Sequence, residues 1–133
     1  MRLGLDIDGT IAADPKFFSA SAAEVLLAGG EVHVVTSRSP EGRRETVAEL
    51  RDLGIKYSAL YLLPPMSVAQ KLCPHANLDW YQRHAWLKVA YALEQDLGCF
   101  VDDDAKVLAL FDRYAPSINA ISFLNRNSMR LMG

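Results

Sequence analysis

The sequence predicts an α/β fold of three layers, in which helices cover both faces of a central parallel sheet of about five strands. Short apolar runs, many of them β-branched, alternate along the chain with longer segments of helical periodicity. These helical segments are long enough to form the crossovers that parallel strands require. Glycine or proline follows most of the segments, as expected where an element ends.

The first half of the chain carries two strands and two helices in alternation. An apolar strand is expected at residues 3–7, and a segment of helical composition follows at 17–27. Residues 32–36 form a β-branched run that predicts the second strand. Ser39 then fits the N-cap position of a helix over residues 41–53, whose apolar residues recur at helical spacing.

The second half continues the alternation, with one irregular stretch. In chain order we expect a strand at 60–63, an irregular segment at 66–78, a helix from Asp79 to residues 94–97, a strand at 99–101, a helix at 105–114 and a strand at 118–123. Residues 124–133 are polar or methionine-rich, and their pattern predicts no element.

Length and composition limit the kind of protein that this chain forms. It has 133 residues, 50% of them hydrophobic, which fits one domain over residues 1–133, with 64–80 as a small insertion or irregular segment. Its 14 basic and 16 acidic residues give a formal net charge of −2, which excludes a strongly basic nucleic-acid wrapper. Two cysteines are too few for a disulfide framework or a four-thiolate zinc site.

We expect a cytoplasmic protein that does not contact a membrane. No apolar run approaches the roughly 20 residues that a membrane-spanning helix needs. Asp6 and Asp8 interrupt the first apolar stretch, so the N-terminus does not resemble a secretory signal. The two cysteines fit a reducing compartment.

Candidate functional residues follow the ends of the predicted strands. In open parallel sheets, ligands bind beyond the carboxyl ends of the strands, where the strand order reverses. Asp6 and Asp8 follow the first strand two residues apart, so their carboxylates point the same way if the strand persists. Gly9 then lets the chain turn sharply and approach a ligand. The structural alternative is a strand end capped by solvated acids.

A second acidic cluster, Asp102, Asp103 and Asp104, follows the fourth strand. Three adjacent carboxylates repel one another unless they are solvated or neutralised, and a hard divalent cation such as Mg²⁺ prefers oxygen ligands of this kind. The alternative is an acidic N-cap for the next helix. Both interpretations hold together if Asp104 is the cap while Asp102 and Asp103 face the metal.

The residues after the second strand offer a seat for a phosphate. Thr36 and Ser37 supply a hydroxyl and backbone N–H groups near a helix N-terminus. Arg38 could form two parallel hydrogen bonds with a substrate phosphate, or it could pair with an acid of the following helix. Lys88 is either a solvated surface residue or a charge partner for the acidic pair, able to hold a phosphoryl oxygen.

These motifs, in this order, resemble those of the haloacid-dehalogenase-like (HAD) phosphohydrolases. The matching motifs are residues 5–10 (LDIDGT), residues 34–37 (VVTS), Lys88 and residues 100–103 (FVDD). The first motif is highly specific, whereas the lysine alone is weak. The resemblance spans residues 5–103 and implies a Rossmann-like fold.

The resemblance implies a catalytic role for four residues. Asp6 would be the nucleophile that forms an aspartyl-phosphate. Asp8 would be the general acid that protonates the leaving oxygen and then the base that activates water. Thr36 would bind the transferring phosphoryl group, and Lys88 would hold both that group and Asp6.

The resemblance also implies a cofactor and a set of binding residues. The cofactor would be Mg²⁺, which neutralises charge between the nucleophile and the phosphate. Its ligands would be Asp6, the backbone carbonyl of Asp8, Asp102 and Asp103. The substrate would contact Gly9, Thr10, Ser37 and Arg38.

The intervals between the motifs leave no room for a substantial cap domain. One helix fills the interval between Thr10 and Thr36, and only residues 64–80 are surplus between Arg38 and Lys88. An open site suits a large substrate, such as a phosphorylated nucleic-acid end. Alternatively, a second subunit of a homo-oligomer closes the site over a sugar phosphate or another small metabolite.

Residues 36–50 are similar to the same region in the phosphatase domains of polynucleotide kinase-phosphatases and in some nucleotidases. This similarity favours a nucleotide or a phosphorylated nucleic-acid end as the substrate. The chain contains no phosphate-binding loop of the kinase type, so only a phosphatase is expected. The alternatives are a phosphotransferase and a degenerate phosphate-binding regulatory protein, which is disfavoured because every catalytic position of the family is filled.

Overall fold

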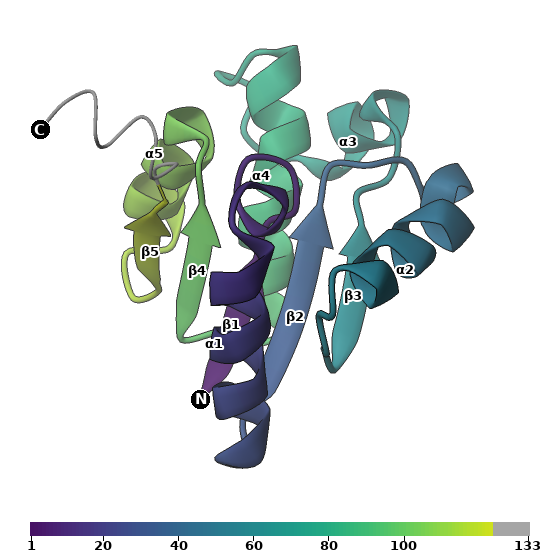
Figure 1. Cartoon of the computed structure of the whole chain (residues 1–133). Coiled ribbons are helices and arrows are strands. Elements are labelled where there is room, and N and C mark those ends of the chain that lie inside the picture. The colour runs from purple at the N-terminus through teal and green to yellow at the C-terminus, as the bar shows by residue number, and fades with distance from the viewer. Residues whose placement is uncertain (124–133) are drawn as a thin grey trace, which may run out of the picture.

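Five parallel strands form the centre of the molecule. The computed structural model describes residues 1–123, and residues 124–133 lie outside the described part. The strand order in the sheet is β3-β2-β1-β4-β5. The strands are β1 (Arg2–Leu5), β2 (Glu31–Thr36), β3 (Ala59–Leu62), β4 (Cys99–Asp102) and β5 (Asn119–Ser122). Helices cover both faces of this sheet (Figure 1), which confirms the predicted three-layer α/β/α fold.

Two helices pack on one face of the sheet and three on the other (Figure 1). The first face carries α1 (Pro15–Leu27) and α2 (Arg43–Asp52). The second face carries α3 (Met66–Leu72), α4 (Trp80–Glu94) and α5 (Ala105–Tyr114). A strand covered on both faces is apolar along its whole length, which explains the continuous apolar runs in the sequence.

Strand β2 shows how the alternation of side chains divides the core. Val32 and Val34 pack with the residues of α1 and α2, while Val35 packs with the residues of α4 and α5. Successive side chains of a strand point to opposite faces of the sheet. Thr36 therefore falls on the same side as Val34, and its side chain is fully buried.

The long helix α4 begins at the residue that the sequence indicates. The Asp79 carboxylate accepts a hydrogen bond from the backbone N–H of Gln82 at 2.7 Å. In return, the Gln82 side chain accepts one from the backbone N–H of Asp79 at 3.0 Å. This reciprocal capping box satisfies two N–H groups that the helix itself leaves unpaired.

The structure differs from the sequence prediction at three places. Strand β1 ends at Leu5 rather than at residue 7, so Asp6 directly follows the strand and Asp8 lies in the turn after it. Residues 66–78, expected to be irregular, contain α3, which buries Ala69 against the α4 side of the core. The helix expected from residue 41 begins with a separate 3₁₀ turn, Pro40–Gly42.

Within residues 1–123, a long connection joins β3 to α4. Its only regular element is α3. It packs along α4 (Figure 1) and forms no large cap over the carboxyl ends of the strands. The prediction that a substantial cap is absent is therefore confirmed. None of the helices in residues 1–123 is long and apolar enough to cross a membrane.

Candidate active site

The carboxyl ends of β1 and β4 bring two distant aspartates together. These strands are neighbours in the centre of the sheet, and they lie where the strand order reverses. Leu5 is paired with Val101, and the backbone N–H of Asp6 continues the ladder to the carbonyl of Val101 at 3.1 Å. Asp6 and Asp102 therefore leave adjacent strands at the same edge, as the reversal of strand order predicts.

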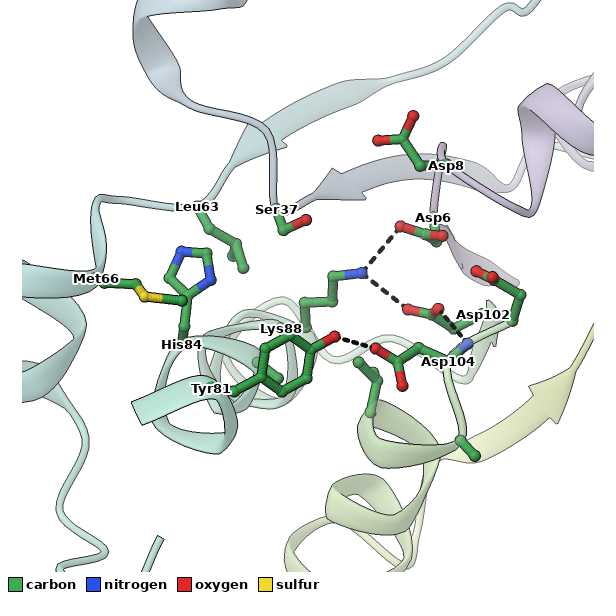
Figure 2. A pocket seen from close by; sticks show the side chains of 14 residues that line it. Asp6, Asp8, Ser37, Leu63, Met66, Tyr81, His84, Lys88, Asp102 and Asp104 are labelled. Carbon is green, nitrogen blue, oxygen red and sulfur yellow. Dashed lines mark hydrogen bonds and ion pairs between the residues drawn. The ribbon is translucent and has the colours of Figure 1, made fainter. Parts of the chain in front are cut away.

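Lys88 of α4 contacts both of these aspartates. Its ammonium lies 2.9 Å from Oδ1 of Asp6 and 2.8 Å from Oδ2 of Asp102. The lysine and both acids are almost fully buried, with side-chain exposures of 5%, 6% and 1% respectively. Figure 2 shows Lys88 reaching from α4 to both carboxylates. It is a charge partner of the acidic pair and not a solvated surface residue.

Burial shifts the pKa values of the charged groups in this cluster. Desolvation raises the pKa of Asp6 to about 7, because the attraction of Lys88 offsets only part of the burial and the Asp102 charge adds to it. Burial also raises the pKa of Asp102, again opposed by Lys88. For Lys88, burial lowers the pKa, but the two carboxylates outweigh it and the net direction is upward. One ammonium thus serves two buried acids, and further positive charge would be stabilising here.

Asp103 completes a group of three carboxylates. One carboxylate oxygen each from Asp6, Asp102 and Asp103 lies within 4.8 Å of the other two. The Thr10 hydroxyl lies 3.2 Å from Asp6 and 3.3 Å from Asp103, within hydrogen-bonding distance of both acids. Thr10 is fully buried, so it holds the first acidic motif against the second.

Gly9 permits this close approach of Asp103. Its φ is +81°, in the left-handed region that favours glycine. A Cβ atom at this position would overlap the carboxylate of Asp103. The glycine of the first motif therefore serves both the turn and the space that the acidic cluster occupies.

Asp104 has a different task from its two neighbours. Its Oδ1 accepts the backbone N–H of Lys106 at 2.9 Å and so caps the N-terminus of α5. Its Oδ2 accepts a short hydrogen bond from the hydroxyl of Tyr81. The structure thus places Asp104 as the cap, while Asp102 and Asp103 belong to the carboxylate group with Asp6.

Asp8 lies at the solvent edge of the site, paired with Arg38. Nε of Arg38 is 3.0 Å from Oδ2 of Asp8, and a terminal nitrogen is 2.8 Å from Oδ1. The other terminal nitrogen contacts Glu49 of α2. These hydrogen bonds lower the pKa of Asp8, against a smaller opposing effect of burial. Arg38 therefore pairs with Asp8 and an acid of the following helix, and Glu49 is a member of the site that the sequence did not reveal.

The two hydroxyl residues at the end of β2 are placed differently. Thr36 is fully buried, its Oγ1 accepts the backbone N–H of Arg38 at 3.2 Å, and it is absent from the pocket wall. Ser37 lines the pocket and is drawn above Lys88 in Figure 2. The alternation of β2 turns the Thr36 side chain toward the α1 and α2 face, so the structure does not bring it to the pocket with the other predicted catalytic residues.

A cavity of about 650 Å³ opens over this cluster. One side presents the acidic residues and Lys88. The other side is built by α3, the first turns of α4 and the start of α5. For that second side the sequence offers only a pair of adjacent aromatic residues, Trp80 and Tyr81. The lining residues are Asp6, Asp8, Ser37, Leu63, Met66, Tyr81, His84, Ala85, Lys88, Asp102, Asp103, Asp104, Ala105 and Val107.

Comparison with known proteins identifies structural neighbours but no family. No protein-family model and no curated protein matches the chain. A solved structure of the Pnkp1/Rnl/Hen1 RNA repair complex contains a chain that matches with a TM-score of 0.66 and 14% identity. A second solved structure, of the Pnkp1/Rnl/Hen1 complex, matches with a TM-score of 0.64 and 15% identity.

These matches establish the fold alone, because so few residues are identical. They cover 92% of this chain but only 42% and 46% of the matched chains. The chain therefore spans less than half the length of each neighbour.

Proposed function

We propose that this chain is a Mg²⁺-dependent phosphomonoester hydrolase of the HAD type, with Asp6 as nucleophile and Asp8 as general acid and base. The observation that carries the proposal is the contact of the buried Lys88 ammonium with Asp6 and Asp102 at the sheet edge where the strand order reverses. A carboxylate held by a lysine, beside two further carboxylates and inside a cavity, suits nucleophilic attack on a phosphate. The resemblance of the four sequence motifs supports the same assignment.

The donor set of the site fits Mg²⁺. The oxygens of Asp6, Asp102 and Asp103 are hard, anionic ligands within reach of one another, and Lys88 compensates only part of their charge. These residues, with the backbone carbonyl of Asp8, would hold the ion. When bound, Mg²⁺ would reduce the repulsion between an anionic nucleophile and an anionic phosphate.

In the first step, a carboxylate oxygen of Asp6 attacks phosphorus and the bond from phosphorus to the leaving oxygen breaks. Protonated Asp8 gives its proton to that oxygen, so the leaving group departs as an alcohol. Lys88 orients Asp6 and stabilises the charge on the transferring group. Ser37 is the hydroxyl of the predicted phosphate seat that faces the cavity.

In the second step, the Asp8 carboxylate takes a proton from water, and the water oxygen attacks phosphorus. The bond between phosphorus and Asp6 breaks, inorganic phosphate leaves, and both aspartates return to their starting states. Asp8 suits both roles in position, since its side chain is 61% exposed at the mouth of the cavity. Arg38 must share or release Asp8 for the proton to be available.

For the substrate, we propose a nucleotide or a phosphorylated nucleic-acid end. The structural neighbours belong to an RNA repair complex, which supports a role near nucleic acid. The absence of a large cap over the described site leaves it accessible to a bulky substrate. Because the neighbouring chains work in a multi-protein complex, a protein partner is also part of this proposal.

The proposal is tested by assaying hydrolysis of nucleotides, sugar phosphates and 3′-phosphorylated oligonucleotides with and without Mg²⁺. We expect Mg²⁺-dependent release of phosphate, and none from Asp6→Asn. Hydrolysis by Asp6→Asn at the rate of the unmodified protein would exclude Asp6 as the nucleophile. Release of phosphate from sugar phosphates alone would overturn the nucleic-acid assignment and leave the chemistry intact.

A further inference from the structure

We propose that the side of the cavity built by α3 and the first turns of α4 is a subsite for the leaving group. The group that it takes is uncharged and has a flat ring with a hydrogen-bond donor, the chemistry of a nucleoside. The inference rests on the proposed phosphatase function, because a leaving group exists only if the ester is cleaved. It goes beyond that function by assigning Tyr81 and His84 to recognition.

The cavity has room for much more than a phosphoryl group. Its volume of about 650 Å³ lies in the range of about 300–1,000 Å³ that is typical of sites for whole small-molecule ligands. The reacting phosphate belongs beside Asp6 and Lys88, on one side of this space. The opposite side is then free for the rest of the substrate, and its residues decide which leaving group fits.

Tyr81 provides a fixed aromatic surface in that space. Its hydroxyl donates to Asp104, and the Lys106 ammonium lies 5.1 Å from the centre of its ring. Asp104 is itself fixed as the N-cap of α5. The Tyr81 residue is nevertheless 43% exposed, so part of its ring is open to a ligand. A ring held in place loses little entropy when a flat ligand stacks on it.

His84 provides a hydrogen-bond acceptor beside this ring. Its Nε2 lies 3.0 Å from the carbonyl oxygen of Pro64, which can only accept, so Nε2 carries the proton. In the neutral ring, Nδ1 then has a free lone pair, and no group of residues 1–123 donates a hydrogen bond to it. Figure 2 shows the imidazole at the wall of the cavity, away from the carboxylates. A ligand with an N–H or O–H group can donate to it.

The remaining walls favour an apolar and uncharged ligand. Leu63 and Ala85 are buried, while Met66 remains 39% exposed at the rim and offers a soft, adaptable contact. A second anionic group on the substrate would meet five carboxylates around the cavity. These carboxylates belong to Asp6, Asp8, Asp102, Asp103 and Asp104. Among the lining residues, the only Lys or Arg is Lys88, which already pairs with Asp6 and Asp102.

The test compares three substrates in the presence of Mg²⁺: glycerol phosphate, phenyl phosphate and a nucleoside monophosphate. Only the last two have a ring, and of these two only the nucleoside monophosphate has a donor for His84 on its leaving group. We expect Tyr81→Leu to reduce the kcat/KM ratio of nucleotide to glycerol phosphate about 5-fold to 150-fold, mainly through KM, since stacking is lost. His84→Leu should reduce the ratio of nucleotide to phenyl phosphate about 2-fold to 10-fold.

Two matched variants complete the design. Tyr81→Phe keeps the ring and loses the bond to Asp104, so it should retain the preference for ringed substrates. Trp80→Leu removes a neighbouring aromatic that is 66% exposed and absent from the cavity wall, so it should leave all three substrates unchanged. If Tyr81→Leu lowers hydrolysis of all three substrates equally, the subsite assignment is wrong.

A binding measurement separates this inference from the proposed function. Calorimetric titration with adenosine, in the presence of inorganic phosphate and Mg²⁺, should detect binding that Tyr81→Leu weakens, even in a protein without turnover. Absence of adenosine binding to the unmodified protein overturns the subsite, whereas absence of all hydrolysis with intact adenosine binding overturns only the phosphatase. Parallel assays with a mononucleotide and a 3′-phosphorylated oligonucleotide distinguish the two sources of the nucleoside.

Discussion

Arg38 binds both carboxylate oxygens of Asp8, at 3.0 and 2.8 Å, while its third nitrogen contacts Glu49. This planar fork fixes the direction of Asp8 at the mouth of the cavity. It also favours the ionised carboxylate, which is the form that activates water and not the form that protonates a leaving group. In the proposed mechanism, a substrate phosphate that draws Arg38 toward itself would release Asp8 for protonation and would so link substrate entry to acid catalysis.

Substitution of Arg38 tests the role of its two hydrogen bonds to Asp8. Arg38→Lys keeps the charge but cannot form two parallel hydrogen bonds. Because charge-assisted hydrogen bonds contribute about 1.5–3 kcal/mol, we expect kcat/KM to fall about 10-fold to 150-fold. Arg51→Lys, whose side chain is 77% exposed on α2, is the matched control and should keep full activity. Steady-state kinetics that do not separate the two variants would contradict a role for Arg38 in the site.

Addition of Mg²⁺ is expected to stabilise the fold. The acidic cluster is buried with one ammonium for its carboxylates, so a cation that binds there removes repulsion in the folded state only. At about 100 times its dissociation constant, a ligand adds about 2.7 kcal/mol to the free energy of unfolding. Thermal unfolding with and without Mg²⁺ measures the shift in Tm.

The matched variant for the metal prediction is Asp103→Asn, the most exposed member of the carboxylate group. It should reduce the increase in Tm while leaving the metal-free Tm near its original value. An equal increase in Tm for both proteins would mean that Mg²⁺ binds elsewhere.

Loss of the Lys88 ammonium is expected to be costly. Lys88→Met leaves Asp6 and Asp102 buried without their cation, and removal of one partner from such a pair costs about 3–5 kcal/mol. Urea unfolding at neutral pH measures the loss, with the exposed Lys71→Met on α3 as the control. Addition of Asp6→Asn to the Lys88→Met background should recover part of the lost stability. A fully additive double variant would contradict the direct contact of the two residues.

Gly9 is expected to tolerate no side chain. Gly9→Ala forces a Cβ into the Asp103 carboxylate at a φ of +81°. The left-handed conformation alone costs a non-glycine residue about 1–2 kcal/mol, and displacement of Asp103 should weaken Mg²⁺ binding as well. Gly42→Ala is the control, because its Cβ would meet no atom within 4 Å and its φ is −89°. Equal stability and Mg²⁺ affinity of the two variants would refute this account of Gly9.

The alternation of strands and helices made the central site predictable. Parallel strands place their carboxyl ends at one edge, so Asp6 and Asp102 could be assigned to one site from their positions after two strands. The pairing of Lys88 could not be derived in this way. The residues alone left Lys88 as either a solvated surface residue or a charge partner of the acids, and the family resemblance favoured the second interpretation.

The positions of several side chains around the cavity could not be predicted from the sequence, for local physical reasons. The phase of side chains at a strand end decides whether Thr36 or Ser37 faces the cavity, and one residue reverses it. Glu49 lies 11 residues after Arg38 in the sequence. Other acids near it were equally good candidates for the partner of Arg38. Tyr81 and His84 line the cavity together with Met66 of α3, a short helix that the sequence pattern did not indicate.

Phosphorylation of Asp6 is the step on which the proposed mechanism depends, and a rapid acid quench during turnover can detect it. The protein is mixed with Mg²⁺ and a phosphomonoester labelled with radioactive phosphorus, quenched, digested and mapped. We expect acid-stable label on the peptide that contains Asp6, formed in a burst before steady-state release of phosphate and absent from Asp6→Asn. Turnover without label on the protein, or label on a residue other than Asp6, would contradict it.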